Sequence, residues 1–266
     1  MIDAVEETVL LNTTRAGVAV VTLNRPKVHN AFNPDVINRL KDIFKTLRGA
    51  DGVRAVLIDG AGPSFSAGAD LVWMRAAADY SASENREDAG DMAGMLHLLH
   101  TLPQVTIALV HGAAMAGGCG ILSACDIAIA TKTASFALSE VRLGIIPAVI
   151  SPYVIRAIGS RAAHRYFLTA ERFDAATAHA LGLIHVLVED NNALAAEAER
   201  MVQQIFTCAP GAIHAAKELI EAVEGRPIDA HVMADTSRRI AERRASDEAK
   251  EGLSAFLQKR KPKWAE

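Results

Sequence analysis

The sequence predicts an α/β domain followed by a smaller helical region. Before residue 200, short apolar runs typical of buried strands alternate with segments of helical periodicity, as in α/β domains. After residue 191 the strand pattern disappears and the density of charged residues rises. We therefore expect an α/β core over residues 1–200 and a helical region over residues 201–266.

The chemical composition narrows the class of protein. A chain of 266 residues is long enough to bury a sizeable core. Half of the residues are apolar and 22% are charged, which is ordinary for a soluble globular protein. The formal net charge is −3, so no overall basic field attracts nucleic acid, and we expect no nucleic-acid partner.

The individual elements follow from periodicity and from capping residues. The expected strands are short apolar or alternating runs over residues 8–13, 18–23, 55–58, 105–110, 127–130 and 184–188. The expected helices cover residues 34–47, 91–102, 117–125, 151–157, 161–169 and 175–181. Asn33 is placed to cap the first helix, Gly159 separates two later ones, and residues 15–17 form a hairpin turn. Residues 71–91 are polar and irregular, and we expect them to form a mobile cover.

The uncharged stretch over residues 105–125 raises the question of a membrane span. Its 21 residues are long enough to cross a bilayer. It contains four glycines, however, and it breaks at His111-Gly112 into a strand and a helix. We therefore expect no membrane partner.

The chain start and the cysteines suggest a compartment. The first ten residues are acidic and lack the basic segment of a secretory signal. Cys119, Cys125 and Cys208 form no CxxC pair, so a disulfide framework is not expected. These features favour the cytoplasm.

Several common catalytic motifs do not occur in the sequence. It has no P-loop, no GxGxxG after a strand, no GxSxG and no HExxH. His97 and His100 lie one helical turn apart beside two leucines, which is more typical of a packed or surface pair than of metal ligands. We expect no metal site.

Three segments carry the candidate chemistry, namely residues 65–71, 111–120 and 139–147. The first two are rich in small residues at strand-to-helix transitions, where a ligand can approach the backbone closely. The N–H groups that begin the helix at Gly117 lack intrahelical acceptors and suit a thioester oxygen that becomes an enolate. Equally, the small residues can serve only to pack the helix tightly against the strand.

These segments stand among others in a recognisable order. The further segments are residues 23–27 (LNRPK), 30–32 (NAF), 167–175 (FLTAERFDA), 182–184 (GLI) and 256–264 (FLQKRKPKW). Taken together, the sequence resembles the crotonase family of enoyl-CoA hydratases and isomerases over nearly its whole length. The resemblance implies a spiral of ββα turns, a C-terminal helical trimerisation region, and homotrimers or hexamers that bind acyl-CoA. Coenzyme A is then part of the substrate, and no separate cofactor is implied.

The resemblance also implies roles for particular residues. By position, Ala69 and Gly117 match the two N–H donors of an oxyanion hole. The coenzyme A side of the site is matched by Lys27, Val28, Ala67, Gly68, Asp70 and Leu71. Without the family, Lys27 would be an ordinary solvated lysine. The basic end that contains Lys259 can reach the phosphates of coenzyme A, or it is simply a solvated helix end.

The catalytic carboxylates depart from the family pattern. Hydratases of the family usually carry two glutamates, of which the second matches Glu140, whereas the first position is Gly120 here. Glu140 would move protons at the acyl carbons, or it merely pairs with Arg142 or caps a turn. For Gly120 we expect a space that admits a branched acyl group or a second water molecule.

The lead prediction of function is hydration of a 2-enoyl-CoA. Residues 71–75, 139–148 and 150–155 look most like a hydratase subgroup that acts on 3-methylglutaconyl-CoA or isohexenylglutaconyl-CoA, which carry a second carboxylate. Arg75 is a candidate partner for that carboxylate, or a solvated arginine. A single glutamate also resembles the Δ3,Δ2-enoyl-CoA isomerases, and the loss of the first glutamate leaves a non-catalytic acyl-CoA binder as a third reading.

Overall fold

The computed structural model describes residues 7–14 and 17–265. The chain forms two compact units, which divide between Arg200 and Met201. The expected hairpin turn at residues 15–17 lies mostly outside the described residues.

The first unit is built on a six-stranded sheet in the order β1-β2-β3-β4-β6-β9. Its strands are β1 Val9–Thr13, β2 Val18–Leu23, β3 Ala55–Gly60, β4 Val105–Val110, β6 Ile127–Thr131 and β9 Val186–Val188. β1 pairs antiparallel with β2, and all the other pairs are parallel. Every residue of β4 is buried, as expected for a central parallel strand covered on both faces. The predicted α/β class is therefore confirmed, with β9 two residues shorter than expected.

A second sheet was not predicted. Its strands are β5 Ala113–Met115, β7 Ser135–Ala137 and β8 Phe173–Asp174, paired in the order β5-β7-β8. Strands of two or three residues are too short to show an alternating pattern, which explains why the sequence did not reveal them. The small sheet matters for the site because β5 leads directly into the buried helix α4.

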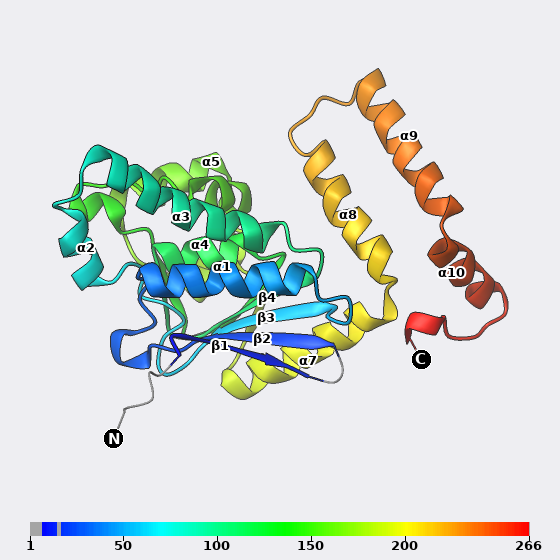
Figure 1. The fold of residues 1–266 in the computed structure, drawn as a ribbon, viewed down its shortest axis with the longest axis horizontal. Helices are drawn as coiled ribbons and strands as arrows, with labels where there is room; N and C mark the ends of the chain where they lie inside the picture. Colours follow the sequence, from blue (N-terminus) through cyan, green and yellow to red (C-terminus); the bar gives the residue numbers. More distant parts are fainter. Residues whose placement is uncertain (1–6, 15–16, 266) are drawn as a thin grey trace. The chain divides into compact units, whose positions relative to one another are not determined.

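Helices cover the sheet. They are α1 Pro34–Arg48, α2 Leu71–Ala77, α3 Ala82–His100, α4 Gly117–Ala124, α5 Ser151–Thr169, α6 Ala175–Ala180 and α7 Asn191–Thr207, with 3-10 turns at η1 Pro26–Val28 and η2 Glu140–Leu143. α1, α3 and α4 lie on one side of the sheet (Figure 1). Asn33 caps α1 by accepting a hydrogen bond from the Val36 N–H, and Gly159 interrupts α5 with a positive φ of 72°, both as predicted.

The expectation of an irregular cover at residues 71–91 is wrong. This stretch forms α2 and the first half of α3. Asp70 caps α2, and Ser81 and Glu84 form a reciprocal capping box that starts α3. The indole N–H of Trp73 donates to Asp88 at 3.0 Å and ties the two helices together. Polar residues are frequent in this segment because much of its surface is exposed to solvent. The capping residues nevertheless make it helical.

Residues 105–125 form β4, β5 and α4. In the part of the chain that the structure describes, no helix combines the length and the apolar character needed to cross a membrane.

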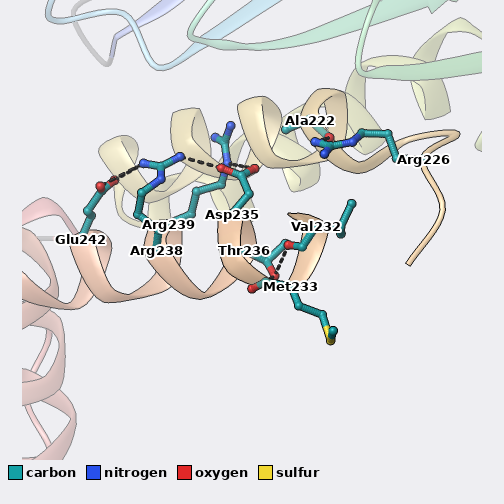
Figure 2. A network of polar contacts seen from close by, with 9 residues as sticks. All are labelled: Ala222, Arg226, Val232, Met233, Asp235, Thr236, Arg238, Arg239 and Glu242. Atoms are coloured by element: carbon teal, nitrogen blue, oxygen red, sulfur yellow. Dashed lines mark hydrogen bonds and ion pairs between the residues drawn. The ribbon is translucent and has the colours of Figure 1, made fainter. Parts of the chain in front are cut away.

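The second unit, from Met201, is helical. It contains the end of α7 and then α8 Pro210–Val223, α9 Ala230–Ala245, α10 Asp247–Leu257 and the 3-10 turn η3 Lys263–Ala265. The Trp264 indole N–H donates to the Thr207 carbonyl at 3.2 Å, and the Gly211 N–H donates to Glu248 at 3.0 Å. Along α9, arginines pair with Asp235 and Glu242 (Figure 2).

Candidate active site

Glu140 stands at the start of η2, three residues after β7. Gly144 ends this turn in the left-handed conformation, with a φ of 75°. The Oε2 atom of Glu140 is buried and accepts no hydrogen bond from the described residues. Burial raises the pKa of this carboxyl above its ordinary value, although its own backbone N–H acts in the opposite direction. Among the described residues Arg142 forms no ion pair with Glu140, so pairing with Arg142 does not explain this carboxyl.

Cys119 lies in the first turn of α4, and its thiol is affected by the charge of Glu140. Its buried thiol donates to the Ala114 carbonyl at 3.1 Å. Burial, and secondarily the nearby charge of Glu140, raise the pKa of the Cys119 thiol to about 12. The thiol therefore stays protonated and unreactive. The Ala116 N–H donates to the Ala137 carbonyl at 2.8 Å, so the strand that ends three residues before Glu140 lies against the residue that precedes α4.

The backbone amide of Ala69 is available to a ligand. Phe32 donates to the Gly68 carbonyl at 2.7 Å, and the Asp70 N–H donates to the Phe32 carbonyl at 2.8 Å. Because successive residues of an extended segment direct their N–H groups to opposite sides, the N–H of Ala69 faces away from Phe32. Within the described part of the chain it has no acceptor.

The amide of Gly117 is available for a different reason. Gly117 is the first residue of α4, so its N–H has no intrahelical acceptor, and no other described group accepts from it. The preceding Ala116 has φ 46° and ψ −111°, a strained conformation that turns the chain from β5 into the helix. Such strain costs about 1–3 kcal/mol and clusters at functional sites.

The segments that carry these two amides run side by side. The Ser66 N–H donates to the Ala113 carbonyl at 3.0 Å, and the Met115 N–H donates to the Ser66 carbonyl at 2.9 Å. A Cβ on Gly68 would lie 3.0 Å from both the Ala116 Cβ and the Met115 oxygen, and the φ of Gly68 is +88°. Only glycine fits this close approach without strain. The predicted Ala69 and Gly117 therefore belong to neighbouring stretches of backbone.

The residues expected to hold coenzyme A fall into two groups. Lys27 and Val28 are exposed on η1, and the carbonyl of the following His29 accepts from the Ala67 N–H at 2.8 Å. Leu71 is 79% exposed at the start of α2. The structure thus joins η1 to the segment that contains Ala67 and Gly68. Lys259 is part of the second unit, where it follows α10 with a φ of 53°.

Asp70 has a structural task. Its carboxylate accepts from the Val72 N–H at 2.8 Å and pairs with Arg25 at 2.8 Å. Burial works against ionisation, yet the Val72 N–H and the Arg25 guanidinium together lower the pKa of Asp70. Because both oxygens are engaged in this way, Asp70 fixes the position of the Ala69 amide next to it. These two contacts explain the position of the Asp70 carboxylate without a direct contact with coenzyme A.

Gly120 does not leave a space, and that expectation is wrong. A Cβ built on this buried glycine would lie 2.3 Å from the Cγ2 atom of Ile150 and 3.1 Å from its Cβ. The Cδ1 atom of Leu96 is 3.7 Å away. The volume is therefore filled by Ile150, the residue that immediately precedes α5.

Apolar neighbours of the site were missed by sequence reasoning. A Cβ on Gly117 would lie 3.1 Å from the Phe32 ring and 3.2 Å from the Cε atom of Met92. Met92 and Leu96 lie one turn apart on α3, and with Phe32 and Ile150 they line the first turn of α4. In the sequence these residues look like ordinary core residues, so no signal set them apart. Among the described residues, no three His, Cys, Asp or Glu side chains are grouped to hold a metal ion.

The site combines two available backbone N–H groups with a carboxyl that has one buried, unpaired oxygen. The amides can stabilise an oxygen that gains negative charge, and the carboxyl, whose pKa is raised by burial, can take up and release a proton. This combination is that of an acid–base enzyme that acts next to a carbonyl group.

Comparison with known proteins narrows this class. Residues 13–266 match the family described as enoyl-CoA hydratase/isomerase. A short-chain-enoyl-CoA hydratase of Clostridium acetobutylicum is 33% identical over 246 residues, which are 92% of each protein. An enoyl-CoA hydratase structure from Shewanella pealeana has a TM-score of 0.93 and 42% identity, covering 97% of this chain and 96% of that one. AtuE of Pseudomonas aeruginosa has a TM-score of 0.93 and 39% identity, covering 98% and 100%. The chain belongs to the enoyl-CoA hydratase/isomerase family and has the crotonase fold.

Proposed function

We propose that the protein adds water to the double bond of a 2-enoyl-CoA. The observation that carries the proposal is the Glu140 carboxyl, whose buried Oε2 atom has no partner among the described residues. Glu140 follows β7, and the last residue of β7 accepts the N–H of Ala116, directly before the Gly117 amide. The curated hydratase of Clostridium acetobutylicum, which matches along nearly the whole chain, supports the same reaction.

In the proposed mechanism the N–H groups of Ala69 and Gly117 donate to the thioester oxygen. The Glu140 carboxylate takes one proton from a water molecule, and the resulting hydroxyl group bonds to C3 of the acyl chain. The π electrons move toward the thioester, whose oxygen carries the negative charge of the enolate. Glu140 then returns the proton to C2, so water has been added and the carboxylate is regenerated. The raised pKa of Glu140 suits it to both transfers.

The substrate is proposed to bind through its coenzyme A part along η1 and the segment before α2. Lys27, Val28, Ala67, Gly68 and Leu71 supply this surface, and the exposed apolar side chains of Val28 and Leu71 suit the pantetheine chain. The mechanism assigns no cofactor, because coenzyme A is part of the substrate. We propose a branched acyl group of the glutaconyl type, for which the exposed Arg75 on α2 is a partner for the second carboxylate.

A second candidate reaction is isomerisation of a 3-enoyl-CoA to the 2-enoyl-CoA. The observation that favours it is that Glu140 is the single carboxyl of the three motifs that is free to move a proton. Asp70 is engaged by the Val72 N–H and Arg25, and Ile150 fills the space beside Gly120. In this reaction Glu140 would take a proton from C2 and return it to C4, with the enolate again held by Ala69 and Gly117.

We also propose that the protein assembles into homotrimers or hexamers in the cytoplasm. The second unit exposes many large apolar side chains, namely Leu219, Ile220, Ile228, Met233, Ile240, Leu253, Phe256 and Leu257. A monomer rarely leaves so much apolar surface in water. Lys259 would then contact coenzyme A phosphates across a subunit boundary. A stable monomer at micromolar concentration in light scattering would contradict the assembly.

The function is tested with purified protein and three substrates, which are crotonyl-CoA, a 3-enoyl-CoA and 3-methylglutaconyl-CoA. Hydration removes the absorbance of the conjugated thioester, whereas isomerisation creates it. We expect loss of absorbance with methylglutaconyl-CoA and with crotonyl-CoA. A rise in absorbance with the 3-enoyl-CoA alone would select the isomerase. Binding of all three without any turnover would show a non-catalytic acyl-CoA binder.

A further inference from the structure

The contact between Gly120 and Ile150 suggests a function for a residue with no chemistry of its own. We infer that Ile150 determines whether position 120 can carry a second acid–base group, because its Cγ2 methyl occupies the space that any side chain at position 120 would need. The inference rests on the proposed function for its catalytic part. Its packing part can be tested without any assay of activity.

Ile150 cannot easily move aside. It is 4% exposed, and its carbonyl accepts the N–H groups of Tyr153 and Val154, both at 3.1 Å, at the start of α5. Its side chain is branched at Cβ, which restricts rotation about χ1. Even after rotation of the γ atoms, the Ile150 Cβ would remain 3.1 Å from a Cβ at position 120.

Gly120 is held just as firmly from the other side. Its N–H donates to the Ala116 carbonyl at 3.1 Å, so it is anchored to the strained turn that precedes Gly117. A shift of α4 away from Ile150 would therefore displace the Gly117 amide that we assign to the thioester oxygen. A side chain at position 120 must displace either Ile150 or part of the site.

The methyl group has a consequence for the acid–base chemistry that we propose for Glu140. A carboxylate at position 120 would accept a hydrogen bond from water and help Glu140 to hold it. Ile150 fills this position with a hydrocarbon instead, so in the proposed mechanism the attacking water depends on Glu140. The pair Gly120 and Ile150 thus acts as one unit, and restoring a second carboxylate requires changes at both positions.

The packing part is tested by a double-mutant cycle with Gly120→Ala and Ile150→Ala. We expect Gly120→Ala alone to lower the Tm by about 5 °C, as overpacking does, and to cause a much smaller loss when Ile150→Ala is already present. Gly94→Ala is the control for adding a methyl to a helix, because nothing lies within 4 Å of its Cβ position. Val154→Ala controls for loss of a buried side chain from α5. Additive Tm changes in the cycle would overturn the inference.

The catalytic part is tested with Gly120→Glu, alone and combined with Ile150→Ala, by following crotonyl-CoA hydration. We expect the single variant to lose stability and activity. We expect the double variant to hydrate crotonyl-CoA about 10-fold faster than Ile150→Ala alone, which is less than the effect of a fully positioned acid–base group. A single variant as stable and active as the double one would overturn the inference. Coupled Tm changes without any gain in hydration would refute the catalytic part of the inference.

The two proposals fail in different ways. If the wild type isomerises a 3-enoyl-CoA but does not hydrate, and the double variant gains hydration, the proposed function is wrong and the inference about Ile150 is supported. If the wild type hydrates well and the Tm changes are additive, the proposed function stands and the inference falls.

Discussion

The carboxyl groups of the two units are held in opposite ways. In the first unit, Glu140 has a buried oxygen without a hydrogen-bond partner, and burial raises its pKa. In the second unit, Asp235 on α9 pairs with Arg238 and Arg239 at 2.6 and 2.9 Å (Figure 2), and its pKa is lowered by those hydrogen bonds. Both environments perturb a carboxyl, but only one leaves an oxygen available.

The difference separates a chemical task from a structural one. A carboxylate already satisfied by arginine gains little from a further partner, and removing it costs only a modest amount of stability because pairs near the surface are weak. A buried carboxyl without a cation is unfavourable for folding, and a protein keeps one where a substrate or water will meet it.

The largest effect is expected for Glu140→Gln. The amide keeps the size of the side chain but cannot accept and return a proton, so turnover should fall about 100-fold or more while the fold and coenzyme A binding persist. The matched control is Glu242→Gln, which removes a carboxylate paired with Arg238 at 2.8 Å. Steady-state kinetics of both variants give the comparison. Glu140→Gln turnover within a few-fold of the wild type would remove Glu140 from the mechanism.

Gly68→Ala should have the next largest effect. The added methyl meets the Ala116 Cβ and the Met115 oxygen at 3.0 Å, and the positive φ is unfavourable for alanine. The Ala69 amide should shift, and kcat should fall about 10-fold, less than for complete loss of an oxyanion donor. Gly94→Ala, which adds a methyl into open space on α3, should leave kcat unchanged. Equal kcat values for the two variants would argue against the assigned position of Ala69.

The raised pKa of Glu140 predicts a particular dependence of stability on pH. The ordinary pKa of a glutamate carboxyl is 4.5, and in the folded protein Glu140 keeps its proton to a higher pH. The contribution of this protonated carboxyl to stability is therefore complete below pH 4.5 and is lost as the pH rises through the raised pKa. Glu140→Gln cannot ionise and avoids the loss. Its Tm should therefore exceed that of the wild type at about pH 8, and the gap should close at about pH 4. A constant gap across this range would show that burial does not perturb Glu140. The kcat/KM of the wild type should rise with pH through the same raised pKa.

The smallest effect is expected in the second unit, at Glu251. Hydrogen bonds from Arg260 lower the pKa of Glu251 to about 2. A depressed pKa stabilises the fold above the ordinary value of 4.5, and that contribution is lost as the pH falls through about 2. Glu251→Gln should thus melt slightly earlier than the wild type at neutral pH and equally at pH about 2, as followed by circular dichroism. Unchanged melting at neutral pH would show that the pair with Arg260 contributes nothing.

Local signals in the sequence predicted the longer elements well. The apolar run over residues 105–110 became β4, and Asn33 and Gly159 shaped α1 and α5 as expected. The same reasoning failed for residues 71–91, where it weighed polarity above the capping residues Asp70 and Ser81. Ala69, Gly117 and Glu140 were chosen from the motifs, and their catalytic roles stay predictions.

By itself, the sequence determined the α/β class and the stretches of small residues that expose backbone amides, because periodicity, caps and glycines act over a few neighbouring residues. Only the tertiary structure decided what surrounds those amides. Gly120 and Ile150 are thirty positions apart, and the contact of 2.3 Å that a Cβ would make exists only because α5 packs on α4. From the sequence alone, a glycine in place of a larger residue suggests an empty space. Protein interiors are closely packed, however, and here an apolar group from a distant part of the chain fills that space.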